Sequence, residues 1–208
     1  LIVQSDKTLL LDVHSPAAEE CRNALIPFAE LEKSPEHLHT YRLTPLSLWN
    51  AASCGFSTED AIEVLKKFSR YEVPQVVCAW IEQVGLRFGK LIIVPDFTEK
   101  TETESELEKE GDFLFLVTEN ANIYAEIKAT RALEKYLSPY PIDTEVYYKF
   151  KNTNSNLPVY GFKLSLMDRG TIKQELLKLG WPVKDEVPLR EGEPLNINLR
   201  KETSNGKP

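Results

Sequence analysis

The chain has 208 residues, of which 42% are hydrophobic and 27% are charged, and its formal net charge is −7. This is the composition of an ordinary globular protein, and the length suits one or two domains, with two slightly favoured. A membrane-spanning helix is excluded because no apolar run reaches about 18 residues, and the N-terminus lacks the basic start and cleavage site of a signal peptide.

The cysteines and histidines predict neither a disulfide framework nor a metal site. The three cysteines are odd in number, and the apolar helical patterns around Cys54 and Cys78 predict buried thiols, which indicates an intracellular protein. His14, His37 and His39 have no cysteine or carboxylate at ligand spacing. We therefore expect no metal in this chain.

The negative charge is concentrated in one segment. Residues 96–112 carry eight acidic and two basic residues, a net of −6, and they contain little that could be buried. We expect this segment to be a loosely held acidic loop. Residues 113–208, with twelve acidic and fourteen basic residues, are mildly basic at +2, which permits phosphate contacts without predicting them.

The first 43 residues predict a hairpin, a helix and a short strand. Ser15-Pro16 reads as an N-cap followed by proline in the first turn, and Pro27 should end the helix near Ile26. These elements are expected at Leu1–Val3, Thr8–Val13, 15–29 and Thr40–Leu43.

Three capped helices and a strand follow. Thr44-Pro45 repeats the cap-then-proline pattern, and Ser57 with Asp60 approaches a capping box. Glycines should end the first and third helices. The helices are expected at 46–54, 57–68 and 74–87, and the strand at Leu91–Val94.

Three helices before a strand is also the order of a winged-helix DNA-binding module. The third helix, however, is largely apolar, whereas a helix that reads DNA needs a basic, polar face. The pattern therefore favours a docking module, for another protein or for another part of the same one.

The second half predicts two hairpins and two helices. The segment EVYYKFK at Glu145–Lys151 alternates strongly and predicts a strand, and Gly180 should end the last helix. The fold class is thus α+β: a hairpin plus helical N-terminal module, followed by an antiparallel sheet with helices. The expected elements are strands at Phe113–Thr118, Asn122–Lys128, Glu145–Lys151, Val159–Leu166 and Leu195–Leu199, and helices at 130–137 and 168–179.

No catalytic motif is present. The nine glycines form no phosphate-binding loop, there is no GxSxG, and the paired carboxylates lie at helix starts, where they complement the helix dipole. The residues alone predict a non-catalytic binding or regulatory protein, with an enzyme of unrecognised site as a minor alternative.

A basic surface in the second half is the candidate DNA-binding site. In a strand, Tyr147, Lys149 and Lys151 would share one face, and further cations would extend it. Such a patch suits contacts to the DNA backbone, although a solvated sheet face explains it equally well. The candidate residues are Tyr147, Lys149, Lys151, Lys163, Arg169 and Lys173.

The segment HTYRLTPLSLW resembles the N-terminal region of XPB helicases, above all the bacterial ones. The family pattern H-x-Y-[RK]-[LI]-T-x-x-[SL]-L-[WY]-x-A is matched here by His39, Tyr41, Arg42, Leu43, Thr44, Leu48, Trp49 and Ala51. FGKLIIV resembles the strand that follows in the family, and 160–200 resembles the end of its damage-recognition domain. Between 96 and 156 only the order of elements matches.

The resemblance implies an N-terminal docking module at 1–95, the acidic loop at 96–112, a damage-recognition domain similar to the mismatch-recognition domain of MutS at 113–200, and a linker to the motor at 201–208. His39, Tyr41, Arg42 and Trp49 would mark the docking surface. The family is an ATP-dependent 3′–5′ DNA helicase and translocase of nucleotide excision repair and, in eukaryotes, of promoter opening. ATP and Mg²⁺ would belong to the motor.

The implied partners are duplex or forked DNA, the helicase's own motor and a repair nuclease or other repair subunit. The implied location is the bacterial cytoplasm, near the nucleoid. The rival hypothesis is a stand-alone protein-interaction subunit with no DNA role.

Overall fold

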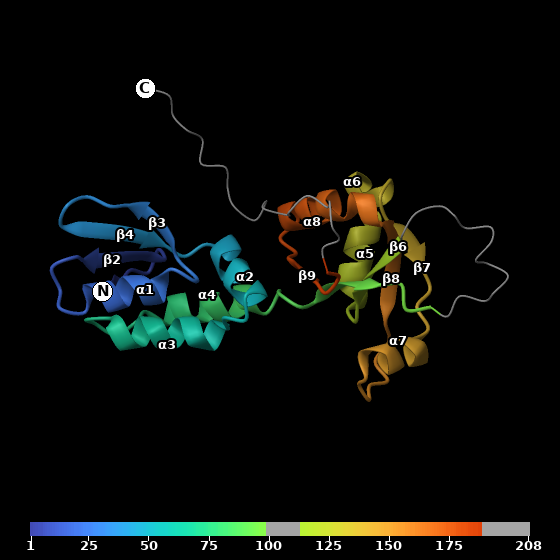
Figure 1. Ribbon diagram of the computed structural model, residues 1–208, viewed down its shortest axis with the longest axis horizontal. Helices are drawn as coiled ribbons and strands as arrows, with labels where there is room; N and C mark the ends of the chain where they lie inside the picture. Colours follow the sequence, from blue (N-terminus) through green and yellow to red (C-terminus); the bar gives the residue numbers. More distant parts are fainter. Residues whose placement is uncertain (99–112, 189–208) are drawn as a thin grey trace, which may run out of the picture. The chain divides into compact units, whose positions relative to one another are not determined.

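The computed structural model describes residues 1–98 and 113–188, which form two compact units (Figure 1). The first unit spans Leu1–Phe88, and the second begins at Gly89. The fold class is α+β, as predicted, with a four-stranded sheet in the first unit, a five-stranded sheet in the second, and eight α-helices in the described residues.

The first unit packs four helices against one antiparallel sheet. Its strand order is β1-β2-β4-β3, and Figure 1 shows α1 and α3 together on one side of this sheet. The elements are β1 (Ile2–Val3), β2 (Thr8–Asp12), α1 (Ala18–Leu25), β3 (Glu30–Lys33), β4 (Leu38–Arg42), α2 (Pro45–Ser53), α3 (Thr58–Phe68) and α4 (Gln75–Gly85).

The predicted hairpin, the three helices and both caps of the first unit are confirmed. The Thr44 hydroxyl accepts from the Ser47 N–H and the Ser57 hydroxyl accepts from the Asp60 N–H, and each cap is reciprocated by the partner side chain. These bonds satisfy backbone donors that a helix start leaves without partners. The buried side chains of this unit form one core, which includes Leu9, Leu11, Leu25, Phe28, Tyr41, Leu43, Leu48, Leu65, Val77 and Ile81.

Three details of the first unit differ from the prediction. Strand β3 was missed because its sequence, ELEK, is charged and lies at the sheet edge, where charge is common. Helix α1 begins after Ala17, without a side-chain cap from Ser15. The strand over 91–94, expected in the first module, pairs with two strands of the second unit.

The second unit is a mixed five-stranded sheet with order β7-β8-β6-β5-β9. Only β5 and β9 pair in parallel; the other pairs are antiparallel. The elements are β5 (Leu91–Pro95), β6 (Phe113–Thr118), α5 (Ala121–Ala129), α6 (Arg131–Glu134), β7 (Ser138–Tyr140), α7 (Thr144–Lys151), β8 (Tyr160–Ser165), the 3₁₀ turn η1 (Leu166–Asp168), α8 (Arg169–Lys178) and β9 (Val183–Asp185).

This sheet is covered on both faces. Alternate residues of β6 and β8, such as Leu116 and Phe162, pack with residues of α5, α6 and α8 on one face. Phe115 and Val117 point the other way and pack with Tyr147 and Tyr148 of α7. We call the second face the α7 face, because α7 covers it.

Two predicted strands are wrong, and the sheet is mixed rather than antiparallel. Residues 122–128 form helix α5, because Asn120 accepts from the N–H groups of Asn122 and Ile123 and so caps a helix where we expected a turn. Residues 145–151 form helix α7, so the hairpin predicted between 145–151 and 159–166 does not exist.

Some predictions concern residues that lie outside the described ranges. These are most of the acidic loop, the strand at Leu195–Leu199 and the linker at 201–208. The first residues after β5 are described, and Phe97 packs among the rings of Phe115, Tyr147 and Phe150 at centroid distances of 5.2–5.6 Å. Phe97 is therefore part of the core on the α7 face.

Replacing Thr44 by alanine should destabilise the first unit by about 1–2 kcal/mol. The change removes the helix cap and the 3.1 Å hydrogen bond from the Thr44 hydroxyl to Glu30 of β3. Urea unfolding, with hydrogen exchange in peptides from α2, measures the loss. Thr44→Ser keeps the oxygen and should remain within about 0.5 kcal/mol of wild type; equal losses in both variants would contradict the role of the cap.

Candidate nucleic-acid interface

Helix α7 carries three of the six predicted DNA-binding residues, and its end signals explain why it is a helix. The Asp143 carboxylate accepts from the Val146 N–H at 3.0 Å, and Asn152 ends the helix in the left-handed conformation, with φ of 54°. Lys149 and Lys151 lie in the last turn, where they complement the helix dipole. These signals were present in the sequence, but the alternation of EVYYKFK masked them.

The sequence predicted Tyr147 on the surface, but in the structure it is buried against the sheet. Tyr147 and Tyr148 are adjacent on α7, about 100° apart around the helix, and both are almost fully buried. The Tyr148 hydroxyl donates to Glu119 at 2.9 Å. Burial, followed by the negative charges of Glu186 and Glu119, raises the pKa of Tyr147 to about 12.

The lysines of α7 differ in what they contact. Lys151 forms a partly buried ion pair with Glu186, at 2.5 Å between Nζ and Oε2. Lys149 is exposed and has no ion pair to any described residue, so its charge remains available at the surface. Of these two predicted cations, Lys149 is therefore the better candidate for a phosphate contact.

Lys163 lies on the α7 face of β8. Its Nζ is 4.1 Å from the centroid of the Phe113 ring, a cation–π arrangement that fixes the side chain over an aromatic surface. The side chain is only partly buried, and the ring does not neutralise its charge. Lys163 thus remains a candidate cation.

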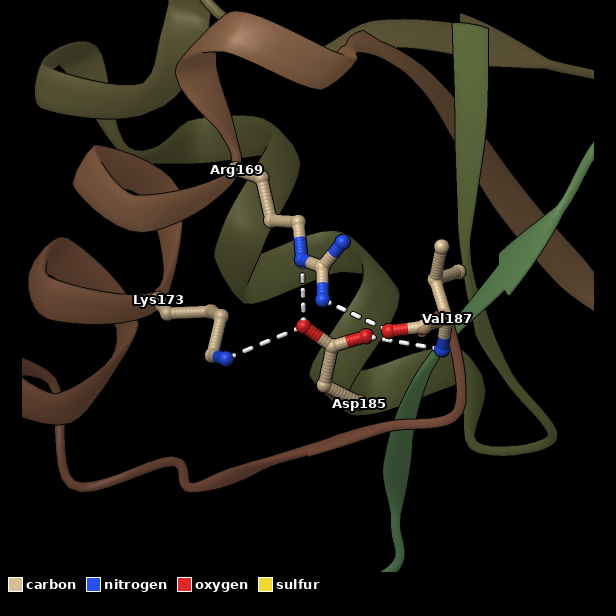
Figure 2. A network of polar contacts seen from close by, with 4 residues as sticks. All are labelled: Arg169, Lys173, Asp185 and Val187. Carbon is tan, nitrogen blue, oxygen red and sulfur yellow. Dashed lines mark hydrogen bonds and ion pairs between the residues drawn. The ribbon is translucent and has the colours of Figure 1, made fainter. Parts of the chain in front are cut away.

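The structure brings Arg169 and Lys173 together, but around a carboxylate. Both side chains point from α8 toward Asp185 on β9 (Figure 2). The Arg169 Nε and Lys173 Nζ atoms lie 2.6 and 3.0 Å from Asp185 Oδ2. Arg169 Nη2 also donates to the Val187 carbonyl oxygen at 2.6 Å, and the Val187 N–H donates to Asp185 Oδ1 at 3.0 Å.

This cluster is an internal brace rather than a DNA-contacting surface. The side chains of Arg169 and Asp185 are only 8% and 10% exposed. Charges so far from water are stable only when paired and hydrogen-bonded. The sequence places Arg169 and Lys173 on a polar surface but does not show that β9 carries a carboxylate that pairs with both. Their assignment as DNA-binding residues stays a prediction.

Two hollows flank α7. The first, of about 490 Å³, is lined by Tyr147, Leu157, the start of β5 with the two residues before it, and the segment 117–121 from the end of β6 to the start of α5. The second, of about 750 Å³, is lined by Lys149, Tyr148 and the polar segment 152–156. Tyr147 and Lys149 were thus assigned to one patch by the sequence and line separate hollows in the structure.

The four predicted docking residues divide into buried and surface positions. Tyr41 and Trp49 are buried, and the Trp49 indole N–H donates to the Val84 carbonyl of α4 at 2.9 Å. These two side chains hold the first unit together and are not part of a docking surface. Arg42 is exposed and 3.6 Å from Glu32, and His39 is partly exposed.

The described residues give no indication of a metal site or a membrane span. They contain no group of three or more His, Cys, Asp or Glu side chains that could hold a metal ion. Nor does any helix within these residues have the length and apolar character needed to cross a bilayer.

Comparison with known proteins places the chain among helicases. A family model described as "Helicase conserved C-terminal domain" matches residues 1–139. The chain is 37% identical over 206 residues to the DNA 3′-5′ helicase XPB of Kineococcus radiotolerans, covering 96% of the chain and 30% of that protein. It is 35% identical over 202 residues to the enzyme of the same name from Mycobacterium tuberculosis, covering 97% of the chain and 32% of that protein.

The similarity extends to eukaryotes. The Drosophila melanogaster protein named general transcription and DNA repair factor IIH helicase/translocase subunit XPB is 35% identical over 86 residues, 41% of the chain and 11% of that protein. The chain therefore belongs to a helicase family. It is homologous to bacterial XPB helicases over about 96% of its length, and it spans about 30% of the length of the bacterial curated relatives it matches.

Replacing Asp185 by asparagine should destabilise the second unit by about 3–5 kcal/mol, because it removes a buried carboxylate that pairs with both Arg169 and Lys173. Urea unfolding of the variant measures this loss. Lys178→Ala is the control: its pair with Glu175 is exposed, so the change should cost less than about 1 kcal/mol. Similar small losses for both variants would show that the brace contributes little.

Stability should fall steeply in alkali because of Tyr147. Its pKa is about 12 in the folded chain and about 10 when unfolded. The unfolded chain therefore loses this proton first as the pH rises, and the stability that is complete below pH ~10 is lost between about 10 and 12. Urea unfolding against pH tests this: Tyr147→Phe should flatten the decline, whereas an unchanged profile would contradict it.

Proposed function

We propose that this chain is the part of an XPB-type helicase that guides DNA and docks on the motor or a repair partner, without performing the chemistry itself. Its family membership supports a role with DNA. The 208 residues contain no phosphate-binding loop, so the proposal assigns ATP and Mg²⁺ to the motor. A likeness of the second unit to the mismatch-recognition domain of MutS remains part of this proposal.

The outer side of α7 is the surface that best fits a DNA backbone. The hollow beside Lys149 is lined by the uncharged polar residues Thr144, Asn152, Thr153, Asn154, Ser155 and Asn156. Side chains of this kind, with lysine, make most phosphate and sugar contacts in protein–DNA complexes. This concentration of hydrogen-bonding groups around a lysine that forms no ion pair within residues 1–98 and 113–188 carries the proposal.

Aromatic side chains lie next to this polar surface. Phe150 of α7 is 43% exposed and stacks on Phe97 with ring centroids 5.2 Å apart. Exposed rings beside cations are typical of surfaces that bind unpaired bases. Glu145 also lines the hollow and opposes phosphate binding, so we expect binding that is weak and depends strongly on salt.

The first unit offers a separate surface for docking. Leu31 is exposed on β3. Leu38 is exposed on the neighbouring strand β4, which also carries His39 and Arg42. Apolar side chains exposed among charged ones are common at protein interfaces. This observation favours docking on the motor or on a repair subunit, and it also keeps the alternative of an interaction subunit without DNA binding.

The chain should bind forked or bubble duplexes with an affinity that falls as salt rises. Lys149→Gln should lower the slope of log Kd against log salt by about one, since one phosphate contact is lost. Fluorescence anisotropy with labelled duplexes over a salt series measures both quantities.

Lys178→Gln is the matched control, because Lys178 is an exposed lysine of the same unit on α8, which covers the opposite face of the sheet. It should leave the slope unchanged. No binding at low salt, or binding that is independent of salt, would overturn the DNA role and leave the interaction subunit as the better explanation.

A further inference from the structure

The cavity beside Tyr147 has a polar group that the fold does not use. Tyr147 is 3% exposed, and its hydroxyl makes no hydrogen bond to any residue in 1–98 or 113–188. The hydroxyl of its neighbour Tyr148, in contrast, donates to Glu119. The Tyr147 hydroxyl is therefore placed to bond to something that enters the cavity.

The cavity has the size and lining of a ligand site. Its volume of about 490 Å³ falls within the range of about 300–1,000 Å³ for small-molecule sites. Apolar side chains of Ile92, Val117, Ala121 and Leu157 form much of the wall. Thr118, Asn120 and Tyr147 provide hydroxyl and amide groups. A flat apolar body with a polar edge would satisfy both kinds of surface.

Charge argues for a neutral ligand rather than a free anion. Lys90 is the one cation among the residues that line the cavity, and Glu119 is the one anion. The two charges offset each other. The Asn120 side-chain oxygen already caps two N–H groups at the start of α5, so the helix start is not an open anion site. Burial keeps the Tyr147 phenol protonated at neutral pH, so it acts as a neutral hydrogen-bonding group.

We propose that this cavity accepts one unpaired base from DNA bound at the α7 face. The base would lie against the apolar wall, and its polar edge would bond to the Tyr147 hydroxyl. Proteins that take a base out of the stack hold it in this way, with apolar contacts on its faces and hydrogen bonds on its edge. Exposed Lys90 would contact the flanking phosphate. This inference rests on the proposed DNA role, and it specifies which part of the DNA, an unpaired base, the cavity binds.

The test uses a duplex with 2-aminopurine opposite an abasic site, since 2-aminopurine fluoresces more strongly when it leaves the base stack. The 208-residue chain should increase this fluorescence on binding. The same duplex labelled for anisotropy reports binding itself. A fully paired duplex of the same sequence should bind more weakly and give no increase.

Two alanines of α5 give a matched pair of variants. Ala121 is exposed and lines the cavity, whereas Ala125 is exposed one turn along the same helix and does not line it. Ala121→Phe should fill the cavity and abolish the fluorescence increase, while binding of the paired duplex stays unchanged. Ala125→Phe should leave both signals unchanged. An increase that survives in Ala121→Phe would overturn the base site.

Removal of the unused hydroxyl tests its role directly. Tyr147→Phe keeps the ring in the core and should reduce the preference for the abasic duplex roughly three- to tenfold. An unchanged preference would overturn the hydrogen bond to the base. Tyr136→Phe, which removes a tyrosine hydroxyl on the opposite face of the sheet, should leave this preference unchanged.

The two proposals fail in distinguishable ways. Anisotropy that shows binding of the abasic duplex without any fluorescence increase would overturn the base site and leave the DNA role standing. No binding of either duplex would overturn both. A response to the free 2-aminopurine deoxynucleoside but not to the duplex would overturn DNA as the source of the base.

Discussion

The second unit depends on the carboxylate of Asp185. This side chain holds Arg169 and Lys173 of α8 and also fixes the backbone at Val187, so one residue joins a helix, a strand and the segment that follows (Figure 2). Strand β9, which carries Asp185, pairs in parallel with β5, the first strand of the unit. The last described strand is thus fastened to the strand with which the unit begins. Because the charges are buried, the pairing is required for the packing to persist.

Ion pairing within the second unit also determines which cations are available to contact DNA. The sequence places six residues on one candidate surface, and in the structure three of them, Arg169, Lys173 and Lys151, form ion pairs with Asp185 and Glu186. A count of basic residues cannot reveal this, because the carboxylates that pair with them lie later in the chain, in β9 and at the residue that follows it. Net charge therefore overstated the basic surface of the second unit.

The sequence predicted the first unit better than the second, for a physical reason. In the first unit, the helix starts are capped by Thr44 and Ser57, whose patterns are local and readable. In α7 the same kind of local information, Asp143 and Asn152, competed with an alternation of apolar and polar residues. The sequence alternates because α7 carries apolar residues, Val146 and Phe150, at exposed positions on either side of the buried pair Tyr147 and Tyr148. Parallel pairing of β5 and β9 was beyond prediction, since it depends on long-range contacts.

The residues that carry the family resemblance serve mainly to fold the first unit. Tyr41, Leu43 and Leu48 are buried, Thr44 caps α2, and Trp49 bonds to α4. They identify the family without locating its site. The polar groups without a partner among the described residues are more informative about function, because a hydroxyl that lines a cavity or an exposed lysine has no internal contact to explain it. Tyr147 and Lys149 are such groups, and they lie two residues apart on α7. This helix, absent from the prediction, is therefore the element on which we expect DNA contacts to depend.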